Sequence, residues 1–171
     1  MQKLLLCIGL LILGGCLGMP QSISPVDDFE LDRYLGKWYE IARLDHPFER
    51  GLEQVTAEYA LDKDGYVIIK NRGFSVEKNK WSQAEAKASF VRGSNEGYLK
   101  VSFFGPFYSS YVVFELDKDS YQYAFVSGSN HSYLWFLSRT PTVDRALMSR
   151  FVETAEHLGF DANGLIYVNQ K

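Results

Sequence analysis

The sequence predicts an all-β protein: an eight-stranded antiparallel up-and-down β-barrel with one C-terminal α-helix packed outside it. Apolar and polar residues alternate over many short segments from about residue 37 onward, which is typical of half-buried strands. Turn-forming residues separate these segments at short intervals, so neighbouring strands are expected to be antiparallel. A single stretch with helical spacing of apolar residues follows Pro141.

Eight segments carry the strand pattern. In one of them Leu99, Val101 and Phe103 alternate with polar residues, and turn sequences such as 62–65 and 92–97 lie between segments. Eight such strands can close into a barrel that leaves no free edge. The expected strands are 37–44, 54–62, 66–73, 80–91, 98–104, 109–116, 121–128 and 132–138, with a further short one at 165–168.

The helix is expected to begin just after Pro141 and to end at Gly159. Thr142 is the expected N-cap. One apolar stripe along the helix predicts that it packs on the outer wall of the barrel. Strands 109–116 and 121–128 are apolar on both faces and are the two candidates for the covered wall. The stripe consists of Val143, Leu147, Phe151, Ala155 and Leu158.

The N-terminal residues have the composition of a processing signal. Lys3 precedes the apolar run 4–13, which is too short to span a bilayer, because a spanning helix needs about 20 residues. Residues 13–16, Leu-Gly-Gly-Cys, resemble the bacterial lipobox over all four positions. The resemblance implies that residues 1–15 are a lipoprotein signal peptide and that Cys16 carries the lipid anchor. The alternative is ordinary secretion with an incidental cysteine.

Residues 16–28 are expected to form an acylated tether, and residues 29–171 the barrel domain. The tether is rich in Gly, Pro and Ser, which is typical of a segment without a core of its own. Leu17 rather than an aspartate follows Cys16. In similar lipoproteins this implies the outer membrane of a Gram-negative bacterium, with the protein facing the periplasm.

Two short motifs resemble those of the lipocalin family. Gly36-Lys37-Trp38 begins the first expected strand as a G-x-W motif, and residues 137–141 match a later family motif with its single Arg139. The resemblance implies that Trp38 closes the barrel floor and that Arg139 lies across its ring. Such a cation–π contact contributes about 0.5–2 kcal/mol. Gly36, Trp38 and Arg139 are therefore expected to be structural rather than ligand contacts.

A narrower resemblance is to the bacterial outer-membrane lipoprotein lipocalins, which are similar to apolipoprotein D. Residues 45–52 and 101–108 carry it, and the whole resemblance covers nearly all of residues 28–170. The family's middle motif is poorly kept, with Asp117 and Tyr121 as its nearest equivalents.

The interior of an eight-stranded barrel is either filled by its own side chains or holds one small ligand. Ala84, Ala86 and Ala88 share one face of their strand, and space remains inside if that face points inward, as it does in similar proteins. Glu40 and Asn71 share the inward parity and are expected either to meet a polar head group or to be satisfied by water. The candidate ligand-binding residues are Glu40, Ala57, Tyr59, Ile69, Asn71, Ala86, Val101, Phe103, Tyr133 and Trp135.

The open end of the barrel should be built from loops opposite Trp38, at 45–53, 74–80, 105–108 and 128–131. Aromatic rings are concentrated there. Three roles are open for them: lining the opening, touching the bilayer, or forming a homodimer contact. The rings belong to Phe48, Phe104, Phe107 and Tyr108.

Other functional classes find little support. The net charge of −3 argues against nucleic acid as a partner. The three histidines are scattered, no cluster has metal-ligand spacing, and neither a G-x-S-x-G elbow nor a P-loop is present, so we expect no catalytic residue, metal or cofactor.

The sequence predicts a membrane-anchored, non-enzymatic binding protein that stores or transports a small hydrophobic or amphipathic ligand of the fatty acid or lysophospholipid class. The apolar and aromatic candidate lining suits an acyl chain. The alternative is an interaction or envelope-structural protein with a filled barrel.

Overall fold

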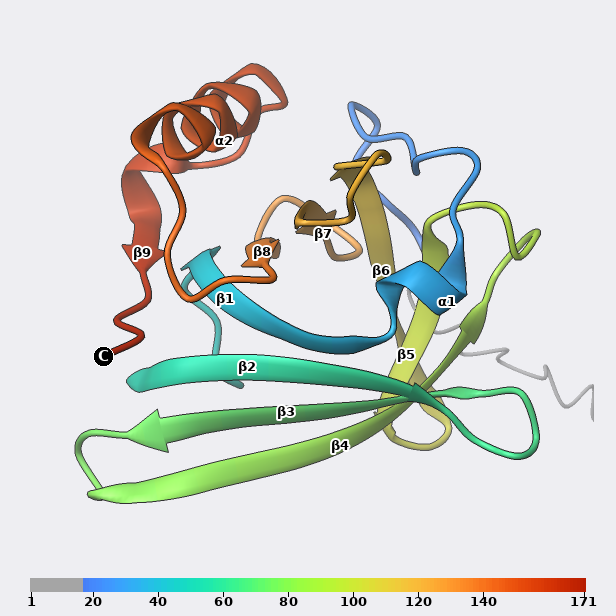
Figure 1. The fold of residues 1–171 in the computed structure, drawn as a ribbon, viewed down its shortest axis with the longest axis horizontal. Helices are drawn as coiled ribbons and strands as arrows, with labels where there is room; N and C mark the ends of the chain where they lie inside the picture. The colour runs from blue at the N-terminus through green and yellow to red at the C-terminus, as the bar shows by residue number, and fades with distance from the viewer. Residues whose placement is uncertain (1–16) are drawn as a thin grey trace, which may run out of the picture.

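The protein is seen in a computed structural model that describes residues 17–171, and its main element is a closed antiparallel β-barrel (Figure 1). The strand order is β2-β3-β4-β5-β6-β7-β8-β1-β9, and a further pairing between β2 and β1 closes the first eight strands. This confirms the predicted barrel. The signal peptide predicted for residues 1–15 and the anchor residue Cys16 lie outside the described residues.

The observed strands agree with the predicted ones to within about two residues at each end. The extra strand after the helix is also present and pairs with β1. The strands are β1 (Gly36–Leu44), β2 (Leu52–Leu61), β3 (Val67–Ser75), β4 (Lys80–Phe90), β5 (Tyr98–Phe104), β6 (Phe107–Leu116), β7 (Tyr123–Ser127), β8 (Leu134–Ser138) and β9 (Leu165–Tyr167).

Two short helical segments were not predicted. They are α1 (Leu31–Tyr34), which precedes β1, and the 3-10 turn η1 (Ala162–Gly164), which precedes β9. Each is too short to show a helical repeat of apolar residues, so periodicity could not identify it.

The main helix, α2 (Arg145–His157), begins later than predicted, and its N-cap is Asp144 rather than Thr142. The backbone of Asp144 is extended, and its carboxylate oxygen accepts a hydrogen bond from the Leu147 amide at 2.7 Å. A carboxylate at this position also interacts favourably with the helix dipole, which explains why Asp144 caps in preference to a threonine. Gly159 follows the helix with φ of +85°, which confirms the predicted end.

We expect Asp144→Ala to lower the free energy of unfolding by about 1 kcal/mol, because the first turn loses its cap. Urea denaturation followed by circular dichroism measures the change. Thr142→Ala is the matched control, since the Thr142 side chain is exposed and does not cap the helix. Equal losses in the two variants would contradict the assignment of Asp144 as the cap.

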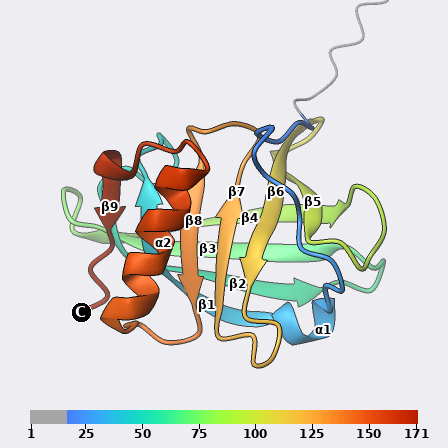
Figure 2. The ribbon, with the colours of Figure 1, turned by 90° about the horizontal axis from the view of Figure 1, so that it is seen from above.

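The barrel wall separates two hydrophobic clusters. The inner cluster contains Trp38, Tyr59 and Val126, and the outer cluster lies between the wall and α2. The ring of Phe151 on α2 lies 4.9 Å from that of Phe125 on β7 and 5.0 Å from that of Phe136 on β8. Figure 2 shows α2 running along this side of the barrel.

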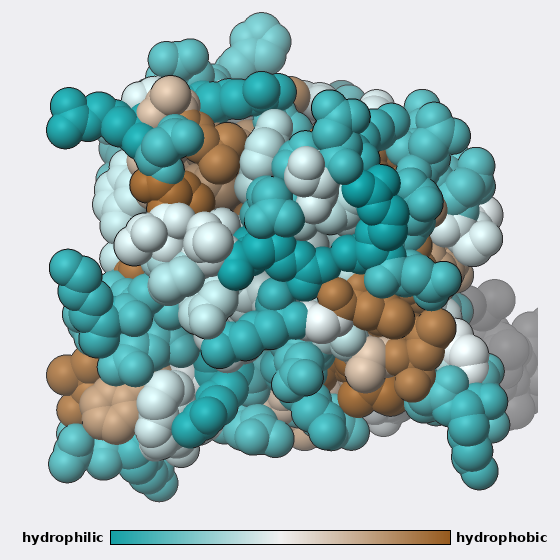
Figure 3. All heavy atoms as spheres, in the orientation of Figure 1, coloured by the Kyte–Doolittle hydropathy of each residue, from teal (hydrophilic) through white to brown (hydrophobic). Residues whose placement is uncertain are grey.

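The helix therefore covers β7, one of the two predicted strands, together with β8. The other candidate, β6, is covered at Phe114, whose ring lies parallel to that of Phe160 beyond the helix at 6.3 Å. On the face shown in Figure 3, hydrophilic residues predominate and apolar residues form separate patches. None of the helices among residues 17–171 has the length and apolar character needed to cross a membrane.

The segment expected to be a tether packs along the outer wall of the barrel. The Tyr98 hydroxyl donates to the Leu17 carbonyl at 2.7 Å, near the open end. Further along, the Val26 amide donates to the Val113 carbonyl at 2.9 Å, and the Val26 carbonyl accepts from the Gly97 amide at 2.9 Å. The segment thus has no core of its own but shares that of the barrel before it reaches α1 (Figure 1).

Candidate functional site

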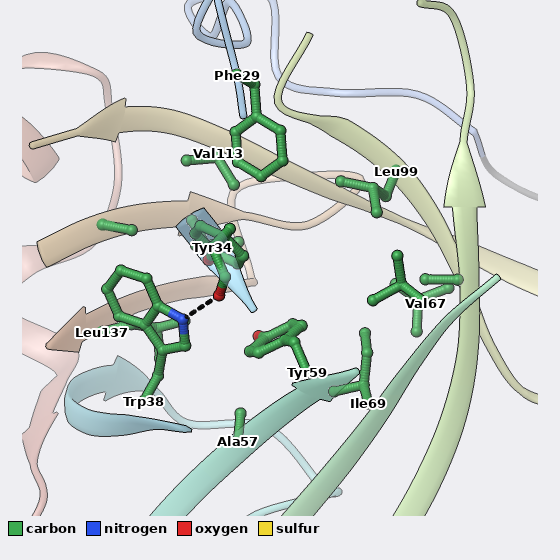
Figure 4. Close-up of a cluster of buried hydrophobic side chains, with 14 of the residues drawn as sticks. Phe29, Tyr34, Trp38, Ala57, Tyr59, Val67, Ile69, Leu99, Val113 and Leu137 are labelled. Atoms are coloured by element: carbon green, nitrogen blue, oxygen red, sulfur yellow. Dashed lines mark hydrogen bonds between the residues drawn. The ribbon is translucent and has the colours of Figure 1, made fainter. Parts of the chain in front are cut away.

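Trp38 and Arg139 close the floor of the barrel. Trp38 is fully buried, and its indole N–H donates to the Tyr34 carbonyl at 2.8 Å, as Figure 4 shows. The guanidinium carbon of Arg139 lies 3.9 Å from the centre of the Trp38 ring. Arg139 also donates to the carbonyls of Lys37 at 2.9 Å and Arg33 at 2.7 Å. These contacts join α1, β1 and the end of β8.

Gly36 begins β1 in a conformation that favours glycine. Its φ is +91°, in the left-handed region where a side chain would be strained. A Cβ atom built at Gly36 would lie 3.6 Å from Nη1 of Arg139, an ordinary van der Waals distance, so space does not exclude a side chain there. The glycine of the G-x-W motif is therefore required by the backbone turn from α1 into β1.

Three tyrosine hydroxyls form a buried chain above this floor. The Tyr111 oxygen lies 2.7 Å from that of Tyr34 and 2.6 Å from that of Tyr59. Burial raises the pKa of Tyr59 and of Tyr111 well above the ordinary value, so both hydroxyls stay neutral at physiological pH. Tyr59 and Tyr111 also line the cavity above these hydroxyls, so the base of the cavity carries polar groups.

The barrel encloses a cavity of about 460 Å³ that opens at the end opposite Trp38. All of the predicted ligand-binding residues except Ala86 line it. Figure 4 shows Ala57, Tyr59 and Ile69 lying on the inner side of their strands. The predicted residues on the lining are Glu40, Ala57, Tyr59, Ile69, Asn71, Val101, Phe103, Tyr133 and Trp135.

Ala86 lies elsewhere. It is buried in the inner cluster and lines a separate groove of about 430 Å³ between β4 and β5. The reason is that β4 pairs with β5 only from Lys87 onward, so the two strands diverge beside Ala86. Ala84 lies farther along the part of β4 that pairs with β3 but not with β5, and it is exposed for the same reason. The inward parity of Ala86 was correct, but parity does not show where neighbouring strands separate.

A cluster of four buried polar side chains, which we call the charged cluster, forms one wall of the cavity. It consists of Glu40, Arg43, His46 and Glu49. Arg43 Nη1 donates to Glu40 Oε1 at 2.7 Å, and Arg43 Nη2 donates to the Glu49 carbonyl at 2.8 Å. Nε2 of His46 lies 2.9 Å from Oε2 of Glu49, which also accepts from the Trp135 indole at 3.0 Å.

The pKa values of the two carboxyl groups in the charged cluster are shifted in opposite directions. Burial and the nearby Glu49 carboxylate raise the pKa of Glu40 well above its ordinary value. Burial also acts to raise the pKa of Glu49, but His46 and the Trp135 indole outweigh it and leave that pKa lowered. Glu40 is therefore the carboxylate of the pair that takes up a proton first as pH falls. Its Oε1 accepts from Arg43, a partner that was not predicted from the sequence, and Glu40 also lines the cavity.

Several lining residues were not predicted. A bulge in β1 between Glu40 and Ala42 shifts the register, so Arg43 points to the same side as Glu40. The following loop then folds inward and brings His46 and Glu49 to the cavity. The charged residues between positions 40 and 50 are a visible signal in the sequence, but in a regular strand Arg43 would point to the side opposite Glu40. Phe48, which was predicted at the open end, is also on the lining, and the unpredicted residues are His46, Glu49, Ser109, Ser110, Tyr111, Ser129, Asn130 and Leu137.

Within residues 17–171, no group of three or more His, Cys, Asp or Glu side chains is arranged to hold a metal ion. The candidate site is thus a mainly apolar cavity with a charged cluster on one wall and tyrosine hydroxyls at its base.

Comparison with known proteins agrees with this architecture. Residues 29–170 match the family model described as Lipocalin-like domain. The chain is 62% identical over 171 residues to outer membrane lipoprotein Blc of Vibrio cholerae serotype O1, covering 100% of both chains. It is 46% identical over 151 residues to outer membrane lipoprotein Blc of Escherichia coli K12, covering 88% of this chain and 85% of that one. These relatives are named as outer membrane lipoproteins of Gram-negative bacteria.

More distant similarities include two animal proteins. Apolipoprotein D of Rattus norvegicus is 28% identical over 131 residues, covering 73% of this chain and 68% of that protein. The crystal structure of the cockroach allergen Per a 4 superposes with a TM-score of 0.69 at 19% identity, covering 90% of this chain and 96% of that one. The motifs, the closed barrel and the family match together show that the chain belongs to the lipocalin family.

Proposed function

We propose that this protein is a membrane-anchored carrier that stores or transports a fatty acid, a lysophospholipid or a related amphipathic lipid. The open, mainly apolar cavity of about 460 Å³ is the observation that carries the proposal. Its volume lies within the range of small-molecule sites, about 300–1,000 Å³.

The anchor and location are part of the same proposal. Residues 1–15 are removed as a signal peptide, Cys16 is acylated, residues 16–28 join the anchor to the barrel, and residues 29–171 form the binding domain. The protein resides in the outer membrane and faces the periplasm. The names of the Vibrio and Escherichia relatives and the match of residues 13–16 to a lipobox support this location.

Binding is driven by removal of the acyl chain from water. Burial of apolar surface gains about 25 cal/mol per Å², from which the cost of ordering the chain is subtracted. Ala57, Ile69 and Val101 supply apolar lining, while the charged cluster occupies the wall nearer the open end. The acyl chain therefore lies deep in the barrel, and the polar end of the ligand lies toward the open end. This mechanism requires no catalytic residue and no cofactor.

A filled barrel that serves only as an interaction or envelope-structural protein is the alternative. The cavity weighs against it, because the inner side chains leave space above the tyrosine chain. Purification from membranes followed by lipid extraction and mass spectrometry separates the two functions. A recurrent lipid with an acyl chain in stoichiometric amount supports the carrier.

Filling the cavity should weaken binding strongly without unfolding the protein. We expect Ala57→Phe and Val101→Phe to weaken binding of a fluorescent fatty acid probe by at least about tenfold, which corresponds to about 1.4 kcal/mol. Both side chains line the cavity, from opposite parts of the wall. Titration of the probe and a thermal melt measure affinity and folding in each variant.

Ala60→Phe is the matched control, because Ala60 lies on the same strand as Ala57 but is exposed. It should bind the probe as the unchanged protein does. Folded cavity variants that keep full affinity would show that the probe binds elsewhere, and the carrier proposal would fail.

A further inference from the structure

We infer that the open end of the barrel lies against the membrane, with the side chains of Phe48, Phe104 and Phe107 inserted among the lipid head groups. Ligand would then pass between the bilayer and the cavity without crossing bulk water. The inference deepens the proposed function and rests on it only for the acyl anchor at Cys16.

The exposed aromatic rings are concentrated at the open end. Phe48 is 70% exposed, Phe104 79% and Phe107 74%. Phe48 lies on the β1–β2 loop, while Phe104 and Phe107 flank the β5–β6 turn. Phe48 also lies parallel to Phe103 at 6.3 Å, and both line the cavity. Exposed rings that continue into an apolar cavity mark a surface suited to an apolar partner.

Charged residues lie at both ends of the barrel, for example Glu77 and Lys78 on the β3–β4 turn at the open end. The opposite end differs because, among residues 17–171, it has no exposed Phe side chain. Its turns between β2 and β3, between β4 and β5, and between β6 and β7 are built from charged and polar residues. Such residues are costly to place among acyl chains, so the floor end faces water. The charged residues of these turns are Asp62, Lys63, Asp64, Arg92, Glu96, Asp117, Lys118 and Asp119.

The N-terminal segment reaches the barrel at the open end. A Cβ atom built at Gly18 would lie 3.9 Å from the carbonyl of Ser129, and Ser129 lines the cavity. Figure 2 places the first described residues beside the turns that join β5 to β6 and β7 to β8. The segment then descends the wall, since Val26 bonds Val113 and Phe29 bonds Asn95.

This route determines the distance between membrane and barrel. Because consecutive Cα atoms are about 3.8 Å apart, an acyl group on Cys16 holds the bilayer next to Leu17. Leu17 is held in turn by the Tyr98 hydroxyl at 2.7 Å. The anchor and the exposed rings are thus on the same edge of the barrel. Acyl chains combined with interfacial aromatic side chains give stronger membrane association than either signal alone.

A second copy of the chain is the competing occupant of these rings. The structure favours the membrane, because a protein partner seated on Phe48 would cover the opening that Phe48 lines. A bilayer at the same place would supply the ligand instead. The anchor position gives an independent reason, since it brings lipid to this edge whether or not the rings are present.

Depth measurement in vesicles tests the inference. Cys7 is removed with the signal and Cys16 is acylated, so one introduced cysteine can be labelled specifically. The lipidated protein with Phe107→Cys is labelled with an environment-sensitive fluorophore and reconstituted in vesicles of phosphatidylethanolamine and phosphatidylglycerol with brominated acyl chains. Asp64→Cys, on the β2–β3 turn at the floor end, is the matched control.

The label at position 107 should be quenched at a depth of about 5–10 Å below the head-group boundary, and the label at position 64 should not be quenched. Equal quenching at the two positions, or stronger quenching at position 64, would overturn the inference. So would a label at position 107 that is unaffected by brominated lipid but self-quenches between copies, since a second copy would then cover the rings. Failure of the protein to float with vesicles would also overturn it, because the anchor would be missing.

The same samples separate this inference from the proposed function. Binding of the fatty acid probe is titrated in each labelled protein. Quenching at position 107 without probe binding would leave the orientation standing and reject the carrier. Probe binding without quenching would leave the carrier standing and reject the orientation. In Phe104→Ser/Phe107→Ser, probe affinity should be unchanged, whereas transfer of the probe from vesicles to the protein should slow.

Discussion

Replacing Trp38 by alanine should lower the free energy of unfolding by about 3–5 kcal/mol, the usual cost of deleting a fully buried aromatic side chain. Trp38 has no exposed surface, and its ring lies 4.8 Å from that of Tyr34. The variant also loses the hydrogen bond to the Tyr34 carbonyl and leaves Arg139 without the ring beneath it. Urea denaturation measured by circular dichroism gives the change.

The affinity for a fatty acid probe should change little in the fraction of Trp38→Ala that remains folded, because Trp38 does not line the cavity. Trp81→Ala is the control at the other end of the barrel. Trp81 is 45% exposed, so its replacement should cost much less than that of Trp38. An unchanged denaturation midpoint together with lost probe binding would place Trp38 in the binding site instead of the floor.

Much of the fold could be predicted because its signals are local. Alternation along each strand and turn residues between strands depend on neighbouring positions, so the barrel and the place of α2 followed from the sequence. The predictions that were wrong concern contacts between segments that are distant in the sequence. Residues 17–28 are held on the outer wall by hydrogen bonds to groups such as the Val113 carbonyl and the Tyr98 hydroxyl. Composition alone cannot reveal such contacts.

The cavity lining was predictable from strand parity only where the strands are regular. Ala57 and Tyr59 on β2 lie at the cavity as parity requires. In β1, the register shift after Glu40 moves Arg43 to the inner side, and with it the anchoring contacts of the following loop. A bulge has no strong sequence signal, so the charged cluster could be recognised only in three dimensions.

Removing the charge of Arg43 should be as damaging as removing Trp38. We expect Arg43→Met to lower the free energy of unfolding by about 3–5 kcal/mol, because Glu40 is left as a buried carboxylate without its cation. The side chain of Arg43 is only 1% exposed, and it also donates to the carbonyls of Glu49 at 2.8 Å and Leu52 at 3.2 Å. Chemical denaturation at neutral pH measures the loss.

The double variant Arg43→Met/Glu40→Leu identifies the cause of that loss. It removes both charges, so it should regain the part due to the unpaired carboxylate but not the part due to the loop carbonyls. Its stability should therefore lie between that of Arg43→Met and that of the unchanged protein. A double variant no more stable than Arg43→Met would show that the loop hydrogen bonds account for the whole effect.

The pH dependence of Arg43→Met gives a second, independent reading of the same carboxylate. Burial already raises the pKa of Glu40, and loss of the cation raises it further. Between the unfolded pKa of about 4.3 and this raised value, the folded protein binds more protons than the unfolded chain, so stability must fall as pH rises. Arg43→Met should therefore be more stable near pH 5 than near pH 8, by a larger margin than the unchanged protein. Glu40→Gln in the same background should remove the difference.

Glu49 contributes the opposite slope. Its lowered pKa stabilises the fold at pH values above the pKa of Glu49 in the unfolded chain, and that contribution is lost as pH falls. If stability still falls from pH 5 to pH 8 after Glu40→Gln, another group titrates, and the ionisation of Glu40 does not determine the stability of the cavity wall.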